Sequence, residues 1–333
     1  MLFSKKFDPK TDLNDLSGKV ALITGANCAT VKHLAVKGAK VYLGSRSEEK
    51  GIEAVQKLTD EGIAAGQVIA LQCDIGTPAS ARQAAENFLK LENRLDILVN
   101  NAGCTYDTTD KTAANGLSII RSFIRKLDVA DVLGHFQKLT KLFSHFGTFQ
   151  FTKSLLPLLI KTSEETNSDV RIVNVSSEIH RRGLGSKPFV DFSTIEPFKE
   201  TYANDMVPWM SRYIVSKLAM VTFSNALQRK LSSTSIICMS IHPGTVNTTF
   251  HTHFNYPRLT NFIASIFFKG PEEGAYNSAL AAASPIVRQC ADKYKGAYLY
   301  PVGRIISPAP ATMSTQVQDD LWETTEKYLR EHP

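Results

Sequence analysis

The most informative stretch of this sequence is Arg171-Ile-Val-Asn-Val-Ser-Ser177, an apolar run that ends in two adjacent serines. Continuous branched apolar residues are typical of a strand that is buried on both faces of a parallel sheet. In a doubly wound sheet, the ligand binds beyond the carboxyl ends of such strands. The two hydroxyls are therefore expected beside a bound small molecule, where one of them can hold a substrate oxygen.

Similar strands, each ending in a polar turn, flank this stretch in the sequence. Upstream lies Leu95-Asp-Ile-Leu-Val-Asn-Asn-Ala-Gly103, and downstream an apolar run over 236–241 leads into His242-Pro-Gly-Thr-Val-Asn-Thr248. The alternation of short apolar runs with helix-period segments predicts an α/β fold of the Rossmann type, a doubly wound parallel sheet with helices on both faces. Strands are expected at 20–24, 40–44, 67–72, 96–100, 171–176, 235–242 and 297–301, and helices at 48–61, 77–91 and 213–231.

Composition narrows the class of protein further. With 43% hydrophobic and 21% charged residues in 333, the chain can bury a large core and is not a disordered protein. The net charge is +6, but Lys and Arg are scattered among Asp and Glu, which argues against a nucleic-acid partner. The five cysteines form no C-x-x-C pair, so neither a disulfide framework nor a metal site is indicated. With no signal-peptide pattern and no membrane-length apolar run, we predict a cytoplasmic protein, with a peripheral position on a membrane as the alternative.

No linker or repeat divides the chain, so we predict a single domain over 18–305. Residues 1–17 are interpreted as an N-terminal extension with too few apolar anchors to predict its structure. Residues 306–333 form a C-terminal tail, in which 316–332 is expected to be a surface helix that closes over one edge of the domain.

Tyr213-Ile-Val-Ser-Lys217 is the main candidate for chemistry. A Tyr and a Lys four residues apart lie on the same face of a helix, where the ammonium can stabilise a tyrosinate. Such a tyrosine exchanges protons near neutral pH. Taken alone the pattern also fits an ordinary solvated helix, but here it follows the serine-ended strand.

Four elements follow one another in the chain: the strand and turn at 95–103, the serine-ended strand at 171–177, the Tyr213 motif, and the strand and turn at 236–248. In this order they resemble the short-chain dehydrogenase/reductase family, and the resemblance runs from Gly18 to about Gly303. Within the family, the chain looks most similar to the retinol-dehydrogenase-like reductases. The resemblance implies Tyr213 as the general acid/base and Lys217 as the residue that lowers its pKa and binds the cofactor ribose. It also implies that Ser177 orients the substrate oxygen, with Ser176 as the alternative.

The same resemblance implies a set of cofactor-binding residues in the polar turns. Asn101, Ala102 and Gly103 would lie beside a ribose, Asp74 at the adenine, and Val246 and Thr248 at the nicotinamide carboxamide. Thr24 and Gly25 belong to the first turn of the dinucleotide site. Each of these residues also has an alternative role in turn formation, and only the set as a whole favours a cofactor site.

The choice of cofactor depends on the end of the second strand, Val41-Tyr-Leu-Gly-Ser-Arg46. An NAD enzyme usually offers a carboxylate to the ribose hydroxyls at this point. Here the chain offers Ser45 and Arg46, and a guanidinium pairs well with a 2′-phosphate. We therefore predict that NADP(H) is preferred over NAD(H).

The first turn departs from the family pattern T-G-x-x-x-G-x-G, because only Gly25 of its glycines remains in Thr24-Gly-Ala-Asn-Cys-Ala-Thr30. The following helix also reaches Lys37-Gly-Ala39 early, which a deletion of about four residues, close to one helical turn, explains. The helix is then expected to pack on the sheet, whereas pyrophosphate binding is weakened. An imperfect gene model or a splice variant is an alternative explanation.

Three further features bear on the substrate side. Residues 118–142 look like an insertion that extends the following helix or forms a hairpin, and we favour a helix that packs on the core or on a partner. Ser144 stands where relatives with a fourth catalytic residue have Asn, which predicts slower proton exchange with solvent. Residues 249–270 occupy the position of the family's substrate lid and are rich in aromatics. An apolar lid favours a lipophilic substrate, and the resemblance to the retinol-dehydrogenase-like reductases adds peripheral membrane contact. Core packing explains the same aromatics equally well.

We therefore predict an NADP-dependent oxidoreductase that interconverts an alcohol and a carbonyl on a small molecule. The sequence itself does not specify an oligomeric state; the resemblance adds a homo-oligomer as one alternative, since the family commonly forms dimers and tetramers. The competing hypothesis is a non-catalytic relative, a binding or scaffold protein that has lost tight dinucleotide binding through the shortened loop. The intact Ser177, Tyr213 and Lys217 favour the enzyme.

Overall fold

A computed structural model describes residues 7–25, 27–103, 129–182, 190–205, 208–244 and 271–332, with the backbone alone for 129–144, 208–209 and 271. Its centre is a sheet of eight strands in the order β3-β2-β1-β4-β5-β6-β7-β8. Neighbours from β3 to β7 pair in parallel, and β8 is antiparallel to β7. The strands are β1 (Val20–Thr24), β2 (Lys40–Ser45), β3 (Val68–Gln72), β4 (Ile97–Asn100), β5 (Arg171–Val175), β6 (Ile237–Ile241), β7 (Tyr298–Tyr300) and β8 (Arg304–Ile306).

This order confirms the predicted doubly wound sheet and all seven expected strands. The chain turns back between β3 and β4, so the sheet has its switch point between β1 and β4, where such folds bind ligands. Only β8 was not predicted. It has three residues, two of them exposed, so it carries no buried apolar signal.

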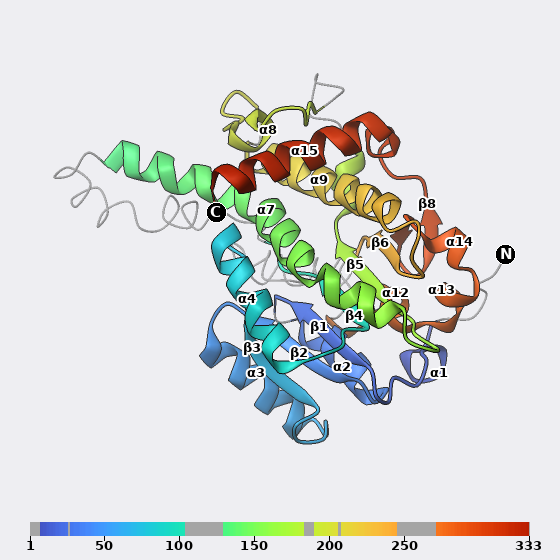
Figure 1. The fold of residues 1–333 in the computed structure, drawn as a ribbon. Helices are drawn as coiled ribbons and strands as arrows, with labels where there is room; N and C mark the ends of the chain where they lie inside the picture. The colour runs from blue at the N-terminus through green and yellow to red at the C-terminus, as the bar shows by residue number, and fades with distance from the viewer. Residues whose placement is uncertain are drawn as a thin grey trace, which may run out of the picture.

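Helices cover both faces of the sheet (Figure 1). One face carries α4 (Pro78–Leu91), α7 (Val129–Ser163) and α9 (Pro208–Lys230), with α15 (Thr315–Glu331) packed outside α9. The other face carries α2 (Cys28–Val36), α3 (Glu48–Asp60) and α12 (Tyr276–Ala283). Short elements complete the description: α1 (Pro9–Asp12), η1 (Glu178–Arg181), α8 (Glu196–Lys199), α11 (Pro271–Gly274), α13 (Pro285–Gln289), α14 (Ala291–Tyr294) and η3 (Pro310–Met313).

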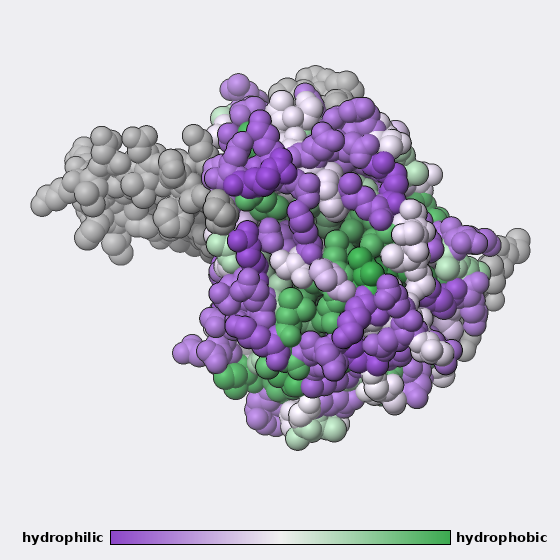
Figure 2. All heavy atoms as spheres, in the orientation of Figure 1, coloured by the Kyte–Doolittle hydropathy of each residue, from purple (hydrophilic) through white to green (hydrophobic). Residues whose placement is uncertain are grey.

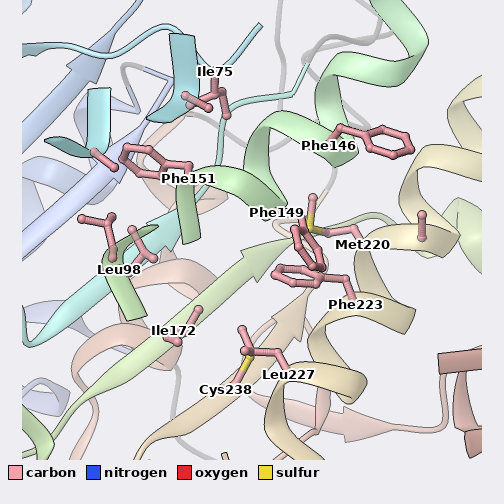
Figure 3. Close-up of a cluster of buried hydrophobic side chains, with 14 of the residues drawn as sticks. Ile75, Leu98, Phe146, Phe149, Phe151, Ile172, Met220, Phe223, Leu227 and Cys238 are labelled. Atoms are coloured by element: carbon pink, nitrogen blue, oxygen red, sulfur yellow. The ribbon is translucent and has the colours of Figure 1, made fainter. Parts of the chain in front are cut away.

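The core on the first face is aromatic (Figure 3). Phe149 from α7 meets Phe223 from α9 with ring centroids 5.3 Å apart, and both rings are buried. Each fully buried side chain of this size contributes on the order of 2–3 kcal/mol by leaving water. The packing fixes α9, and with it the Tyr213 motif, against β5 and β6.

The helix after the first turn packs as expected. Val31, Leu34 and Ala35 of α2 are buried, so the apolar face of the helix is directed inward against the sheet. The helix has nine residues and begins at Cys28, immediately beyond the turn that follows β1.

The sequence predicted the structure of the C-terminal end better than that of the N-terminal end. The C-terminal helix over 316–332 is confirmed as α15, with Val317, Leu321 and Leu329 buried. The N-terminal segment is more structured than expected: Phe7, Leu13 and Leu16 are buried in the second core cluster. Three separated anchors give no helical or strand period, so the pattern did not predict this packing.

The apparent insertion lies partly inside a helix. Residues 129–142 belong to α7, which confirms that this part extends the following helix, whereas 118–128 fall outside the described residues.

Hydrophobic side chains reach the surface near α7 in the middle of the viewed face, framed by hydrophilic ones (Figure 2). Within the described ranges, no helix combines the length and apolar character needed to cross a bilayer.

Candidate active site

The turns after β1 and β4 meet at the switch point of the sheet. The hydroxyl of Thr24 accepts hydrogen bonds from the backbone N–H groups of Asn101 and Ala102 at 3.1 and 3.0 Å, and the Asn101 side-chain amide donates to the Thr24 carbonyl at 2.9 Å. Gly25 has φ +83°, and a Cβ there would lie 2.7 Å from the Ala102 Cα atom. Only glycine therefore fits this close approach.

The serine pair follows β5 at the same edge of the sheet. Ser176 donates from its hydroxyl to the Lys217 carbonyl at 2.8 Å, so it is used to hold α9. Ser177 has an extended backbone and caps η1, accepting a long 3.4 Å hydrogen bond from the Ile179 N–H. Its side chain also interacts with Tyr213, and this interaction favours the lower pKa of the phenol. Of the two serines, Ser177 is thus the one whose side chain interacts with Tyr213, whereas the Ser176 hydroxyl makes a structural contact.

Tyr213 and Lys217 share one face of α9, and the Lys217 ammonium lies 5.6 Å from the centroid of the Tyr213 ring. The ammonium donates to the Val175 carbonyl at 3.1 Å and lies close to Gly103, where a Cβ would be 3.2 Å from Nζ. Among the described residues Lys217 has no ion-pair partner. A buried cation next to the β4 turn is suited to a ligand hydroxyl or anion.

Burial shifts the pKa values of both side chains. It lowers the pKa of Lys217 to about 8, because the charged form is desolvated. Burial also raises the pKa of Tyr213, and the hydrogen bond with Ser177 opposes this only in part. The net direction for Tyr213 is opposite to the lowering expected from Lys217. For Tyr213, desolvation of the tyrosinate has a larger effect on the pKa than the nearby Lys217. The Lys217 amine faces the ring and is only partly protonated near pH 8.

The residues expected at the adenosine end lie at the ends of β2 and β3. Asp74 accepts a 2.9 Å hydrogen bond from the Gly76 N–H, which is the turn role weighed against adenine binding. Ser45 is buried, and its side chain faces Gly51 of α3, where a Cβ would lie 3.3 Å from that of Ser45. Arg46 is exposed, so of Ser45 and Arg46 it is the residue whose side chain is accessible to a phosphate.

The amino end of α2, where such folds hold a pyrophosphate, is capped from within the chain. The Asn27 side chain accepts from the Thr30 N–H at 3.1 Å and donates to the Asn101 side-chain carbonyl at 3.0 Å. The Lys217 ammonium, which has no ion-pair partner among the described residues, and the close backbone contact at Gly25 are features that suit a nicotinamide dinucleotide. The helix terminus that would bind its pyrophosphate is less suitable, because the Asn27 side chain already accepts a hydrogen bond there.

Several predicted positions fall outside the description. Val246, Thr248 and the lid at 249–270 lie outside the described residues, and so does the side chain of Ser144.

The sequence did not predict two further contacts beside the candidate site. His180 bonds to the Ser177 carbonyl, and Asn100 donates to Asn174 across β4 and β5 at 2.8 Å. An Asn inside an apolar strand was the available signal for the second contact.

Comparison with known proteins agrees with this geometry. The family model described as short chain dehydrogenase matches residues 19–188. A short-chain dehydrogenase/reductase of Armillaria gallica is 34% identical, covering 99% of this chain and 98% of the relative. Retinol dehydrogenase 14 of Mus musculus is 29% identical, covering 93% of this chain and 86% of the relative.

Solved structures share the fold. The Pseudomonas aeruginosa RhlG/NADP active-site complex aligns with a TM-score of 0.61 at 22% identity, covering 87% of this chain and 96% of that one. The 3-ketoacyl-(acyl-carrier-protein) reductase from Brucella melitensis complexed with NADH aligns with a TM-score of 0.56 at 22% identity, covering 86% and 98%. The chain belongs to the short-chain dehydrogenase/reductase family. It is related to retinol dehydrogenases, in a family of oxidoreductases that generally act on alcohol and carbonyl groups with nicotinamide dinucleotides.

Proposed function

We propose that this protein is an NADP(H)-dependent oxidoreductase that interconverts an alcohol and a carbonyl on a lipophilic small molecule. The observation that carries the proposal is the contact between Ser177 and Tyr213 with the Lys217 ammonium on the same helix face. A nicotinamide cofactor supplies or accepts the hydride in such a reaction. Everything else in the reaction is the work of the chain's own side chains.

Ser177 donates from its hydroxyl and can pass this hydrogen bond from the Tyr213 phenol to a substrate oxygen. Tyr213 then gives its proton to that oxygen during reduction and takes it back during oxidation. Lys217, with a pKa of about 8, is poised to carry positive charge below that pH and to stabilise the tyrosinate that remains. Asn101, Ala102 and Gly103 are proposed to hold the ribose, with Thr24 and Gly25 behind them.

The preference for NADP(H) is supported by Arg46, which is exposed at the carboxyl end of β2. Its guanidinium can form charge-assisted hydrogen bonds to a 2′-phosphate. Ser45 is not part of this proposal, because its side chain faces α3. Asp74 is proposed to bind the adenine, and Val246 and Thr248 the carboxamide.

The lipophilic substrate, a homo-oligomer and membrane contact through 249–270 stay predictions.

The non-catalytic alternative is favoured by one observation, the internal cap that Asn27 places on α2. A tightly capped terminus has fewer free N–H groups for a pyrophosphate. The alternative predicts a folded protein that transfers no hydride, whereas the enzyme hypothesis predicts transfer despite weaker cofactor binding.

Hydride transfer tests the proposal directly. The purified chain is incubated with NADPH that carries deuterium at C4 and with a panel of apolar aldehydes and ketones, and the alcohols are analysed by mass spectrometry. Deuterated alcohol, absent in Tyr213→Phe, is the expected result. If the chain binds NADPH but transfers no deuterium to any carbonyl, or if Tyr213→Phe transfers it equally well, the proposed mechanism is wrong.

A further inference from the structure

The turn that carries Ser177 is held by a histidine outside the motif. Ser177 is the second residue after β5, and its own cap of η1 is a long 3.4 Å contact. The shorter contact is to His180, whose Nδ1 atom lies 2.6 Å from the Ser177 carbonyl oxygen. The same Ser177 carbonyl accepts a longer hydrogen bond from the backbone N–H of His180 at 3.2 Å. The imidazole therefore supplies the shorter of the two bonds that hold this turn.

The second ring nitrogen of His180 fixes the direction of this bond. The backbone N–H of Ala309 donates to Nε2 at 3.2 Å. Because an N–H group can only donate, Nε2 carries the lone pair and Nδ1 carries the proton, which it donates to the Ser177 carbonyl. Both nitrogens of a neutral imidazole are thereby used in a defined tautomer.

Burial maintains this state of the imidazole. His180 is 2% exposed, and its ring meets that of Tyr298 at a centroid distance of 4.5 Å. Desolvation lowers the pKa of His180 to about 4, so the ring is neutral throughout the neutral pH range. Neither the tautomer nor the charge changes under conditions in which Tyr213 can act.

The contact links Ser177 to the helix that carries Tyr213 by a second route. The Ala309 carbonyl accepts from the Thr312 hydroxyl at 2.7 Å, and the Thr312 carbonyl accepts from the Asn225 side-chain amide at 3.0 Å. Asn225 lies on α9, three turns beyond Tyr213. The path from Ser177 through His180 and the segment 309–312 to α9 closes a hydrogen-bonded frame around the site.

We propose that His180 is a positioning residue, which sets the place of the Ser177 hydroxyl relative to the Tyr213 phenol by tying the turn after β5 to residues 309–312. The inference rests on the proposed roles of Ser177 and Tyr213. A displacement of about 1 Å at a reacting group lowers a rate by up to ~100-fold, so loss of the frame should affect chemistry more than cofactor binding.

Two substitutions separate the parts of this frame. His180→Phe keeps a buried ring against Tyr298 but neither hydrogen bond. His180→Asn places an amide near the Nδ1 position, where it can still donate to the Ser177 carbonyl. Asp169→Asn is the control for lost stability, because it weakens the ion pairs with Arg171 and Arg288 at the opposite edge of the sheet, far from Ser177.

The first test needs no cofactor and no substrate. In protein labelled with 13C at the tyrosine ζ carbon, the Tyr213 signal is assigned with Tyr213→Phe and titrated toward alkaline pH. Loss of the Ser177 hydrogen bond in Ser177→Ala should raise the pKa of Tyr213. We expect His180→Phe to raise it by a similar amount, His180→Asn to restore most of the wild-type value, and Asp169→Asn to leave it unchanged.

The second test is a double-mutant cycle on turnover. His180→Phe should lower kcat by about 10-fold or more with little change in the Kd for NADPH, and should lower it no further in the Ser177→Ala background. A full additional loss in that background, or a wild-type Tyr213 pKa in His180→Phe, would overturn the inference while leaving the proposed function intact. If Ser177→Ala itself leaves both the pKa and kcat unchanged, the proposed role of Ser177 fails, and the inference fails with it.

Discussion

The side-chain amide of Asn27 donates a hydrogen bond to the side-chain carbonyl of Asn101 over 3.0 Å. The two residues are 74 positions apart, and they join the turn after β1 to the turn after β4. Asn27 also accepts from the Thr30 N–H and so caps α2. The chain thus satisfies by itself a helix terminus that related folds offer to a pyrophosphate.

Removing this internal cap should improve cofactor binding. Asn27→Gly frees the Thr30 N–H and lets the backbone approach a phosphate, so we expect several-fold tighter NADPH binding at a stability loss of only a few tenths of a kcal/mol. Asn27→Asp keeps an acceptor for Thr30 but adds negative charge, and should weaken binding. Calorimetric titration of both variants measures the effect. Equal affinities for wild type, Gly and Asp would show that no phosphate binds at this terminus.

Lys217 is expected to be destabilising at neutral pH. Its pKa is about 8 in the folded protein, whereas an unperturbed lysine has a pKa of 10.5, so the unfolded chain binds more protons between these values. The stability deficit therefore grows as the pH falls from 10.5 to about 8 and stays constant below. Lys217→Met should raise Tm at pH 7, with a gain that shrinks above pH 8, while it abolishes turnover. A lower Tm for Lys217→Met at pH 7 would show that the ammonium is paired.

Acid should destabilise the protein through buried neutral histidines. Burial lowers the pKa of His145 to about 3, and its Nε2 atom lies 2.9 Å from the Thr325 hydroxyl of α15. Unfolded His145 gains a proton below pH 6.5 but the folded one does not, so stability falls between about pH 6.5 and 3. The slope is at most about 1.4 kcal/mol per pH unit for one such group. Urea unfolding of His145→Gln should show a shallower decline in this window, and an unchanged decline would assign it to other groups.

Cofactor preference should depend on Arg46 and not on Ser45. Arg46→Glu replaces a phosphate partner with a carboxylate that repels a 2′-phosphate and can accept from ribose hydroxyls, so the ratio of the Kd values should shift toward NADH by at least ~10-fold. Ser45→Ala serves as the matched control, because its side chain faces Gly51. A shift in the control with none in Arg46→Glu would mean that the phosphate is held on the other side of β2.

The sequence predicted the sheet better than the site, for physical reasons that particular residues illustrate. Strands buried on both faces, such as β5, carry a continuous apolar run, whereas the short exposed β8 does not. The Tyr213 motif predicted a shared helix face correctly. The effect of burial, which raises the pKa of Tyr213, could not be predicted, because the spacing of a motif contains no information about burial.

Contacts between distant turns were beyond the reach of local patterns. The loss of glycines after Gly25 was visible, but the capping of α2 by Asn27 and its bond to Asn101 depend on how the turns meet in space. The bridge from His180 to Ala309 spans 129 positions and follows from no spacing rule.

Cofactor titration tests the central claim most directly. The chain is excited at its tryptophans, Trp209 and Trp322, and energy transfer to bound NADPH is followed, with NADH as the comparison. Saturable binding at micromolar NADPH, weaker for NADH and tightened by Asn27→Gly, is the result we predict. No saturable signal with either cofactor at millimolar concentration, in wild type or in Asn27→Gly, would contradict the account and leave a folded relative of the family that has lost its cofactor.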